Sequence, residues 1–156
     1  MLRKTIKYED FDENPREMTA YFNLNERELA ELVEEFGGRD SLQNLFASIK
    51  GSGDASKLTS FMRTIIKKSY GQKSGDGNRM VKNDEVWDAF YQSEAYNEFF
   101  MEVMASDEAN QSFLSQVVSK RLRPNVAAAM AKAAAEEEEA KDDSVTSKVF
   151  VLNAGQ

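Results

Sequence analysis

The sequence predicts an α+β fold that is predominantly helical, with a β-hairpin at residues 3–23 packed on a bundle of about five to six helices in residues 25–123. Three observations predict it. Apolar residues alternate around a proline-containing turn near the N-terminus, helical spacing with capping residues recurs from residue 25, and the composition changes to Ala and Glu after Pro124. We therefore expect a globular domain at residues 1–123 and an acidic, Ala-rich tail at residues 124–156.

The hairpin is predicted by two strand-like runs and the turn between them. Ile6 and Tyr8 fall on one face of the first run, and Met18, Tyr21 and Phe22 lie in the second. The intervening "DENPR" has turn chemistry, because Asn-Pro favours turn initiation and Pro15 cannot pair within a central strand.

The first helix has the clearest predicted start. Asn25 can cap it, Glu28 can reach back to the backbone N–H of Asn25, and Leu24 and Leu29 occupy the positions of a hydrophobic staple. Its apolar stripe is formed by Leu29, Leu32, Val33 and Phe36, and Gly37-Gly38 provide a left-handed stop.

Later helices follow the same logic. Asp40 with Gln43, Asn83, Ser93 and Ser106 stand at predicted helix starts. The apolar stripes are Leu42, Leu45, Phe46 and Ile49; Leu58, Phe61, Met62, Ile65 and Ile66; Val86, Trp87, Phe90 and Tyr91; Tyr96, Phe99, Phe100, Val103 and Met104; and Phe113, Leu114, Val117 and Val118. Lys120, Arg121 and Arg123 suit the negative end of the last helix.

The tail differs in composition from the domain. Alanine favours helix at residues 126–141, but four successive glutamates repel one another and little area is available for burial. We expect a solvated, partly helical tail. Its last apolar run, Val149, Phe150, Val151 and Leu152, resembles a short strand or a docking peptide.

The composition excludes much chemistry. The chain has no Cys and no His, so it offers no thiol nucleophile, no Ser-His-Asp arrangement, no His or Cys zinc site and no disulfide. A formal net charge of -7 disfavours nucleic acid as the partner. No stretch approaches the length of a membrane span, and the N-terminus lacks the apolar region of a signal peptide. We expect no cofactor and no metal.

The glycine-rich stretch at residues 67–82, "KKSYGQKSGDGNRMVK", fits neither a phosphate loop nor a calcium loop. Lys73-Ser74 precede the second glycine of a P-loop pattern, and an EF-hand starting at Asp76 would place Met80 and Trp87 at ligand positions. We interpret it as a capped turn between two core helices, with Gly71 as a helix C-cap and residues 74–78 as a tight turn that accepts positive φ.

Two clusters are candidates for binding a protein partner. Arg63, Lys67, Lys68, Lys73, Arg79 and Lys82 form a basic patch, which is either a solvated face or a contact for an acidic partner. An aromatic cluster at residues 87–100 is either core or a groove for a partner. The candidate binding residues are Lys67, Lys68, Lys73, Arg79, Trp87, Tyr91, Tyr96, Phe100, Val149, Phe150, Val151 and Leu152.

The middle of the chain resembles the tail assembly chaperones of long-tailed bacteriophages. Its "KSYGQKSGDGNRMVK" corresponds to Lys68, Ser69, Tyr70, Gly71, Lys73, Ser74, Asp76, Gly77, Arg79, Met80 and Lys82, and its "FYQSEAYNEFFME" to Phe90, Gln92, Ser93, Glu94, Ala95, Tyr96, Phe99, Phe100, Met101 and Glu102. The resemblance covers residues 4–122, and we expect the tail to lie outside it.

The resemblance implies a non-enzymatic protein of the host cytoplasm. Members of the family bind the tape-measure protein, a long, apolar, mostly helical rod, keep it soluble and help tail-tube subunits polymerise around it. Partners implied are the tape-measure protein, the tail-tube protein and a frameshifted longer form of the same gene product.

Two other hypotheses stay open at this point. One is a structural tail or head-completion protein retained in the virion, whose hairpin adds to a neighbour's sheet. The other is a carboxylate-dependent enzyme, but no arrangement of acidic residues in the sequence indicates a catalytic pair. We also expect a homo-oligomer, because the apolar run at residues 149–152 and the edges of the hairpin are possible contacts.

Overall fold

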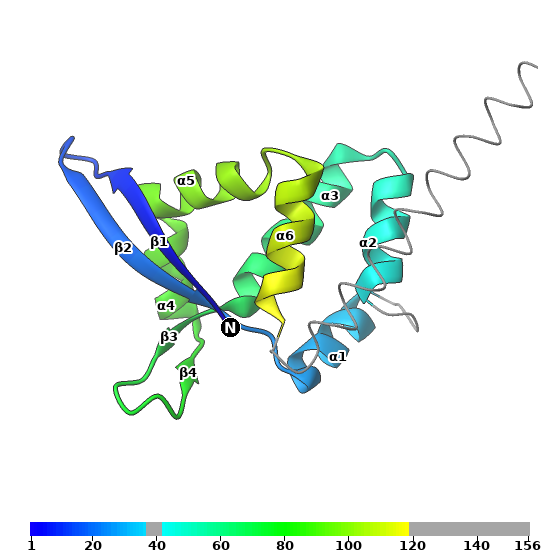
Figure 1. Ribbon diagram of the computed structural model, residues 1–156, viewed down its shortest axis with the longest axis horizontal. Helices are drawn as coiled ribbons and strands as arrows, with labels where there is room; N and C mark the ends of the chain where they lie inside the picture. The colour runs from blue at the N-terminus through cyan, green and yellow to red at the C-terminus, as the bar shows by residue number, and fades with distance from the viewer. Residues whose placement is uncertain (37–41, 119–156) are drawn as a thin grey trace, which may run out of the picture.

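The structure, a computed structural model, describes residues 1–36 and 42–118, with backbone only at residues 42 and 43 (Figure 1). The strands are β1 (Leu2–Glu9), β2 (Pro15–Phe22), β3 (Tyr70–Lys73) and β4 (Met80–Val81). The helices in the described part are α1 (Glu26–Glu35), α2 (Leu42–Gly51), α3 (Ala55–Ser69), α4 (Asp84–Tyr91), α5 (Glu94–Val103) and α6 (Asp107–Val117). The predicted class, a mainly helical α+β fold with an N-terminal hairpin, is confirmed.

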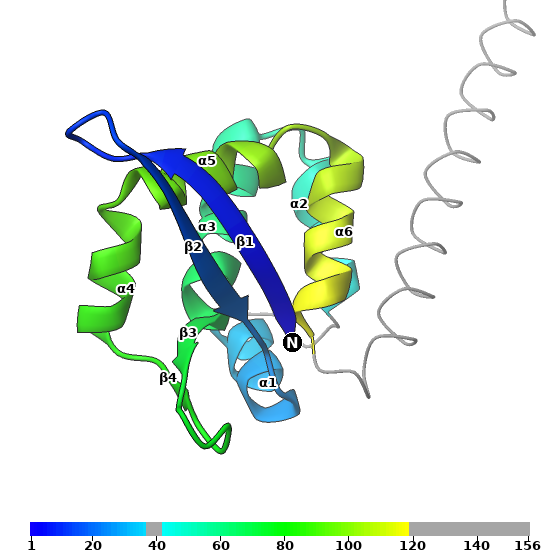
Figure 2. The same ribbon diagram turned by 60° about the vertical axis from the view of Figure 1, so that its left-hand side comes forward.

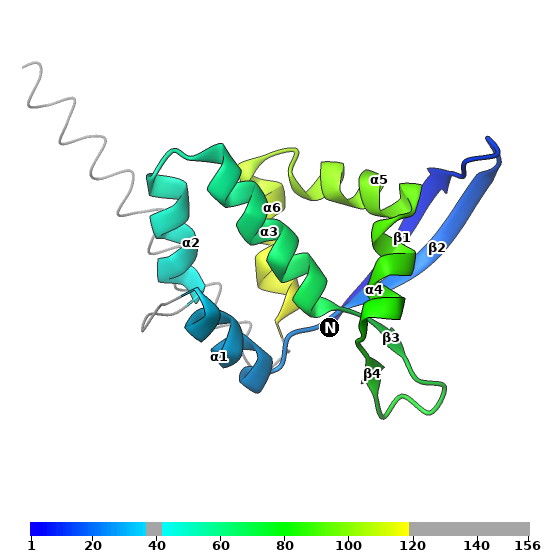
Figure 3. The same ribbon diagram turned by 180° about the vertical axis from the view of Figure 1, so that it is seen from behind.

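The elements form a sheet at one end of the molecule and a helical part that extends away from it. Figures 1 and 3 show α3 and α6 between the sheet and the pair α1 and α2, while α4 and α5 lie beside the sheet. None of the helices in residues 1–36 and 42–118 is long and apolar enough to cross a membrane.

The N-terminal hairpin forms as predicted. β1 and β2 pair antiparallel from Leu2↔Phe22 to Glu9↔Pro15. Asp10 organises the turn, since its Oδ1 accepts hydrogen bonds of 2.9 Å from the backbone N–H groups of Asp12 and Asn14. Glu13 adopts φ 64°, a left-handed conformation that completes the reversal.

The interpretation of the glycine-rich stretch as a turn between two helices was wrong. The sheet has four strands in the order β1-β2-β3-β4, and Gly71 belongs to β3, where it pairs with Tyr21. Tyr70, in an extended conformation, is the C-cap of α3. The tight turn predicted at residues 74–78 is present between Ser74 and Arg79 and contains Gly77 at φ 75°, but it joins β3 to β4. Strands this short have no recognisable alternation, and β3 exists because β2 supplies its partner.

The helix starts follow the predicted caps. Asn25 and Glu28 form a reciprocal capping box, and the side chains of Asn83, Ser93 and Ser106 each accept from the backbone N–H three residues later. Asp54 caps α3 in the same manner. Other predicted features lie outside the described part of the chain: Gly37-Gly38, the cap Asp40, the side chain of Gln43, the basic group Lys120, Arg121 and Arg123, the boundary at Pro124, and the tail.

The core joins the sheet to the helices through aromatic rings. Phe22, with no exposed surface, stacks on Phe99 at 4.5 Å and meets Tyr70, Phe90 and Phe113 at 5.6 to 6.1 Å between ring centroids. These rings come from β2, β3, α4, α5 and α6. The predicted apolar stripes supply the other buried residues, among them Leu32, Phe61, Ile65 and Leu114.

Candidate partner-binding surface

A surface pocket lies where α1, the C-terminal turn of α3 and the start of α4 converge. Its volume is about 320 Å³, and it is lined by the apolar groups of Leu32, Tyr70 and Trp87 together with charged side chains at its rim. We call it the α1–α4 pocket. Leu32 comes from the apolar stripe of α1, Tyr70 from the first position of β3, and Trp87 from the first turns of α4.

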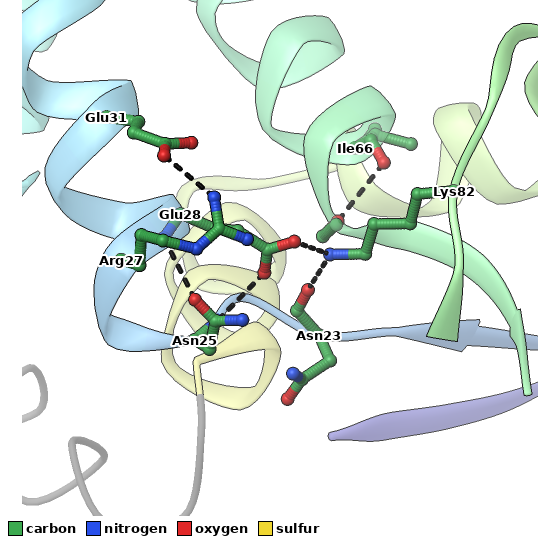
Figure 4. A network of polar contacts seen from close by, with 8 residues as sticks. Asn23, Asn25, Arg27, Glu28, Glu31, Ile66 and Lys82 are labelled. Carbon is green, nitrogen blue, oxygen red and sulfur yellow. Dashed lines mark hydrogen bonds and ion pairs between the residues drawn. The ribbon is translucent and has the colours of Figure 1, made fainter. Parts of the chain in front are cut away.

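A hydrogen-bond network braces one wall of this pocket. The ammonium Nζ of Lys82 donates to Oε1 of Glu28 and to the backbone carbonyl of Asn23, both at 2.7 Å, while Glu28 also closes the capping box with Asn25 (Figure 4). The side chains of Lys82 and Glu28 are 20% and 19% exposed. The ion pair therefore ties the residue after β4 to the first turn of α1.

The charges around the rim differ in how far they are neutralised. Arg27 pairs with Glu31 at 2.7 Å, and Lys68 pairs with Glu35 at 3.0 Å. Lys67 is exposed and makes no ion pair with any residue that the structure describes. The pocket thus offers an apolar floor beside one uncompensated cation.

A chain of four aromatic rings continues from the pocket along α4 and α5. Trp87 stacks on Tyr91 at 5.3 Å, Tyr91 meets Tyr96 at 4.9 Å, and Tyr96 stacks on Phe100 at 5.7 Å. We call these four residues the aromatic ladder. Trp87 and Tyr96 are 8% and 9% exposed, Phe100 is half-buried, and Tyr91 is 42% exposed. Trp87 belongs to both features, so its ring connects the wall of the pocket to the ladder.

Burial sets the protonation of the two tyrosines in this region. Burial raises the pKa of the Tyr70 hydroxyl and that of Tyr96, where the nearby guanidinium of Arg63 offsets part of the effect. Both therefore stay neutral across the physiological range. The buried Oη of Tyr96 has no hydrogen-bond partner of normal geometry within the described chain.

The structure brings together some of the predicted binding residues and separates others. Lys67, Lys68 and Trp87 line the pocket, and Tyr91, Tyr96 and Phe100 extend from it. Lys73 lies on β3 with its Nζ 5.4 Å from the ring centre of Tyr21, and Arg79 lies at the end of the β3–β4 turn, so neither lines the pocket. Val149, Phe150, Val151 and Leu152 fall outside the described residues.

Sequence reasoning missed two contributors to this surface. Tyr70 was expected at the end of a helix, directly before Gly71, and Leu32 was recognised only as part of a core stripe. Glu28 and Lys82 were placed in unrelated features, a capping box and a basic patch. No local signal could reveal their contact, because 54 residues separate them in the chain.

The fold is a small α+β domain, and its α1–α4 pocket combines an apolar floor with a charged rim. No group of three or more acidic residues in the described ranges is placed to hold a metal ion.

The profile of a family described as "Phage tail assembly chaperone" matches residues 1–154, and the chain belongs to this family. The match confirms the resemblance, but it also includes the tail, so the expectation that the resemblance ends at residue 122 was wrong. The comparisons with curated proteins and with solved structures gave no match.

Proposed function

We propose that the chain binds the tape-measure protein of its phage without catalysing a reaction, keeps that client soluble in the host cytoplasm, and promotes assembly of the tail tube around it. Family membership establishes the role of tail assembly chaperone. The identity of the client, the tail-tube protein and a frameshifted longer form as further partners, and the cellular site are parts of the proposal.

The observation that carries the proposal is that the ring of Trp87 lines the α1–α4 pocket and also stacks on the exposed Tyr91 of the aromatic ladder. An amphipathic helix binds a groove through apolar side chains spaced at three and four residues, and a pocket of about 320 Å³ followed by exposed Tyr91 offers successive contacts of that kind. Lys67 adds a contact for an acidic side chain that flanks the apolar stripe of the client.

The surface also suits a client that must later be released. Of the four ladder residues, Tyr91 has the largest exposed fraction, and the other three are buried or half-buried. The apolar area that the ladder can bury against a client is therefore modest. Modest apolar area with a salt-screened charge contact favours reversible binding. Tube subunits can then displace the chaperone as they polymerise.

Co-expression with the tape-measure protein tests the proposal. Wild-type chain should keep the tape-measure protein in the soluble fraction, and Tyr91→Asp or the double variant Lys67→Glu/Lys68→Glu should shift it to the pellet. Lys73→Glu and Phe11→Ser are matched controls, because they change an exposed cation and an exposed aromatic residue that do not line the pocket.

Two results would count against the proposal. If the pocket and ladder variants keep the client as soluble as wild type while the proteins stay folded, this surface is not the binding site. If the chain is found in purified virions at stoichiometric amounts, the rival hypothesis of a structural tail or head-completion protein replaces that of a chaperone.

A further inference from the structure

Within the described residues β1 pairs only with β2, so its other edge has no strand partner there. It is the outermost strand of the described sheet (Figure 2). The backbone N–H of Asp10 donates to Asn14 across the turn, and that of Asn23 donates to Ser69 on the far side of β2. Backbone groups in antiparallel strands alternate in direction. Those of Arg3, Thr5, Lys7 and Glu9 therefore point away from the sheet.

A groove runs beside this edge, between β1 and α6. Its volume is about 140 Å³, with Leu2, Phe99, Val103 and Phe113 as its apolar lining and the Lys4–Glu102 ion pair at its rim. We call it the β1–α6 groove. A strand paired with β1 would project every second side chain over this groove, so the site supplies both backbone hydrogen bonds and an apolar recess.

The chain itself contains a segment suited to this site. Residues 145–152, "VTSKVFVL", consist mainly of β-branched and aromatic residues and equal β1 in length at 8 residues. Gln116 of α6 lines the groove. Val118, the last residue of this part of the chain that the structure describes, follows two positions later, so the tail starts close to the groove. Residues 119–144 separate this segment from Val118, and a random coil of that length has an end-to-end distance of about 30 Å, which is enough for a return to the groove. The family match includes this segment.

We propose that residues 145–152 of the same chain add as a further strand to the free edge of β1, with alternate apolar side chains over the β1–α6 groove. Unprotected edges of this length are prone to pair with other chains, and an intramolecular strand prevents this. The proposal does not depend on the identity of the client.

Residue-resolved amide hydrogen exchange on the full-length chain tests the proposal. The outward amides of Arg3, Thr5 and Lys7 should exchange about tenfold more slowly in wild type than in Val149→Pro/Val151→Pro, as expected when the segment is docked about 90% of the time. The inward amides of Lys4 and Ile6 should be equally protected in both proteins. Ala131→Pro/Ala133→Pro is the matched control and should retain the protection of wild type.

The reciprocal variant is Thr5→Pro, which removes one outward donor while leaving the pairing with β2. It should abolish protection of the alternate amides in residues 145–152. Equal exchange of the outward amides in wild type and in the Val149/Val151 variant would overturn the proposal. So would protection that disappears on dilution, because the strand would then come from a second copy.

Discussion

Gly71 occupies a position where no side chain fits. A Cβ added there would lie 2.8 Å from Cγ of Met80 and 3.0 Å from both Cγ of Lys82 and the carbonyl oxygen of Val81. The close approach of β3 and β4 therefore requires glycine, whereas the sequence suggested a helix-capping role. Gly75, in the same hairpin, has no atom within 4 Å of the corresponding position.

This difference predicts the effects of two alanine substitutions. Gly71→Ala should lower the free energy of unfolding by about 1–3 kcal/mol, because the strands must move apart to admit the methyl group. Gly75→Ala should change it by less than about 0.5 kcal/mol. Urea denaturation checks both values. Equal midpoints for Gly71→Ala and wild type would show that the hairpin accommodates the methyl group without losing stability.

Asp10 predicts a pH dependence of the hairpin turn. The hydrogen bond from Arg16, followed by that from the backbone of Asn14, lowers the pKa of Asp10. A lowered folded pKa stabilises the native state above the ordinary carboxyl value, and this contribution disappears as pH falls through the folded value. Wild type should therefore be more stable than Asp10→Asn at pH 7, and the difference should shrink below pH about 4.

Thermal unfolding at several pH values checks this prediction. Asp12→Asn is the control, because it removes a like charge from the same turn while leaving the side-chain hydrogen bonds of Asp10 in place. A stability difference between wild type and Asp10→Asn that stays constant from pH 7 to pH 2 would contradict the assignment.

At the scale of elements, one ion pair holds the second hairpin against the first helix. Lys82 follows β4 and Glu28 lies in the first turn of α1, and the two meet with little exposure to solvent. Glu28 also caps the helix, so a single carboxylate serves both local and tertiary structure.

Removal of the Lys82 ammonium group should therefore lower the free energy of unfolding more than removal of one partner of an exposed ion pair. Lys82→Met leaves the carboxylate of Glu28 and the carbonyl of Asn23 without their donor, and we expect a loss of about 1–2 kcal/mol in the free energy of unfolding. Arg27→Met breaks the exposed pair with Glu31 and should cost less than about 0.5 kcal/mol. A double-mutant cycle with Glu28→Gln measures the coupling, which should vanish if the pair is only incidental.

At the scale of the whole molecule, Phe22 connects the sheet to three helices. Its ring contacts rings of α4, α5 and α6 and one of β3, so the separate elements share one aromatic core. Such sharing predicts that sheet and helices unfold together.

Phe22→Ala should lower the free energy of unfolding by about 3–5 kcal/mol, because it leaves a cavity among four rings. Phe11→Ala, at a position that is 76% exposed on the turn of the hairpin, should cost less than about 0.5 kcal/mol. Circular dichroism in urea, followed together with Trp87 fluorescence, should give coincident transitions. Separate transitions would show that the sheet and the helical part are independent units.

The candidate surface could be predicted only in part. Lys67, Lys68 and Trp87 were identified as binding candidates, and the structure places them around one pocket. Tyr70 and Leu32 were not, because an apolar floor is made by residues from three elements whose spacing in the chain is arbitrary. Lys73 and Arg79 were grouped with the lysines by proximity in sequence, but they lie beyond the end of α3 in the β3–β4 hairpin.

The sequence by itself determined the starts of α1, α4, α5 and α6, the N-terminal hairpin and the apolar faces. Each of these depends on residues within a few positions of one another: a capping side chain and its own helix, or a turn and the two strands it joins. Only the tertiary structure decided that residues 70–73 form a strand, that Gly71 must lack a side chain, and that Glu28 and Lys82 share a wall of the α1–α4 pocket. These features require contacts between distant segments, and such contacts exist only once the whole core has formed.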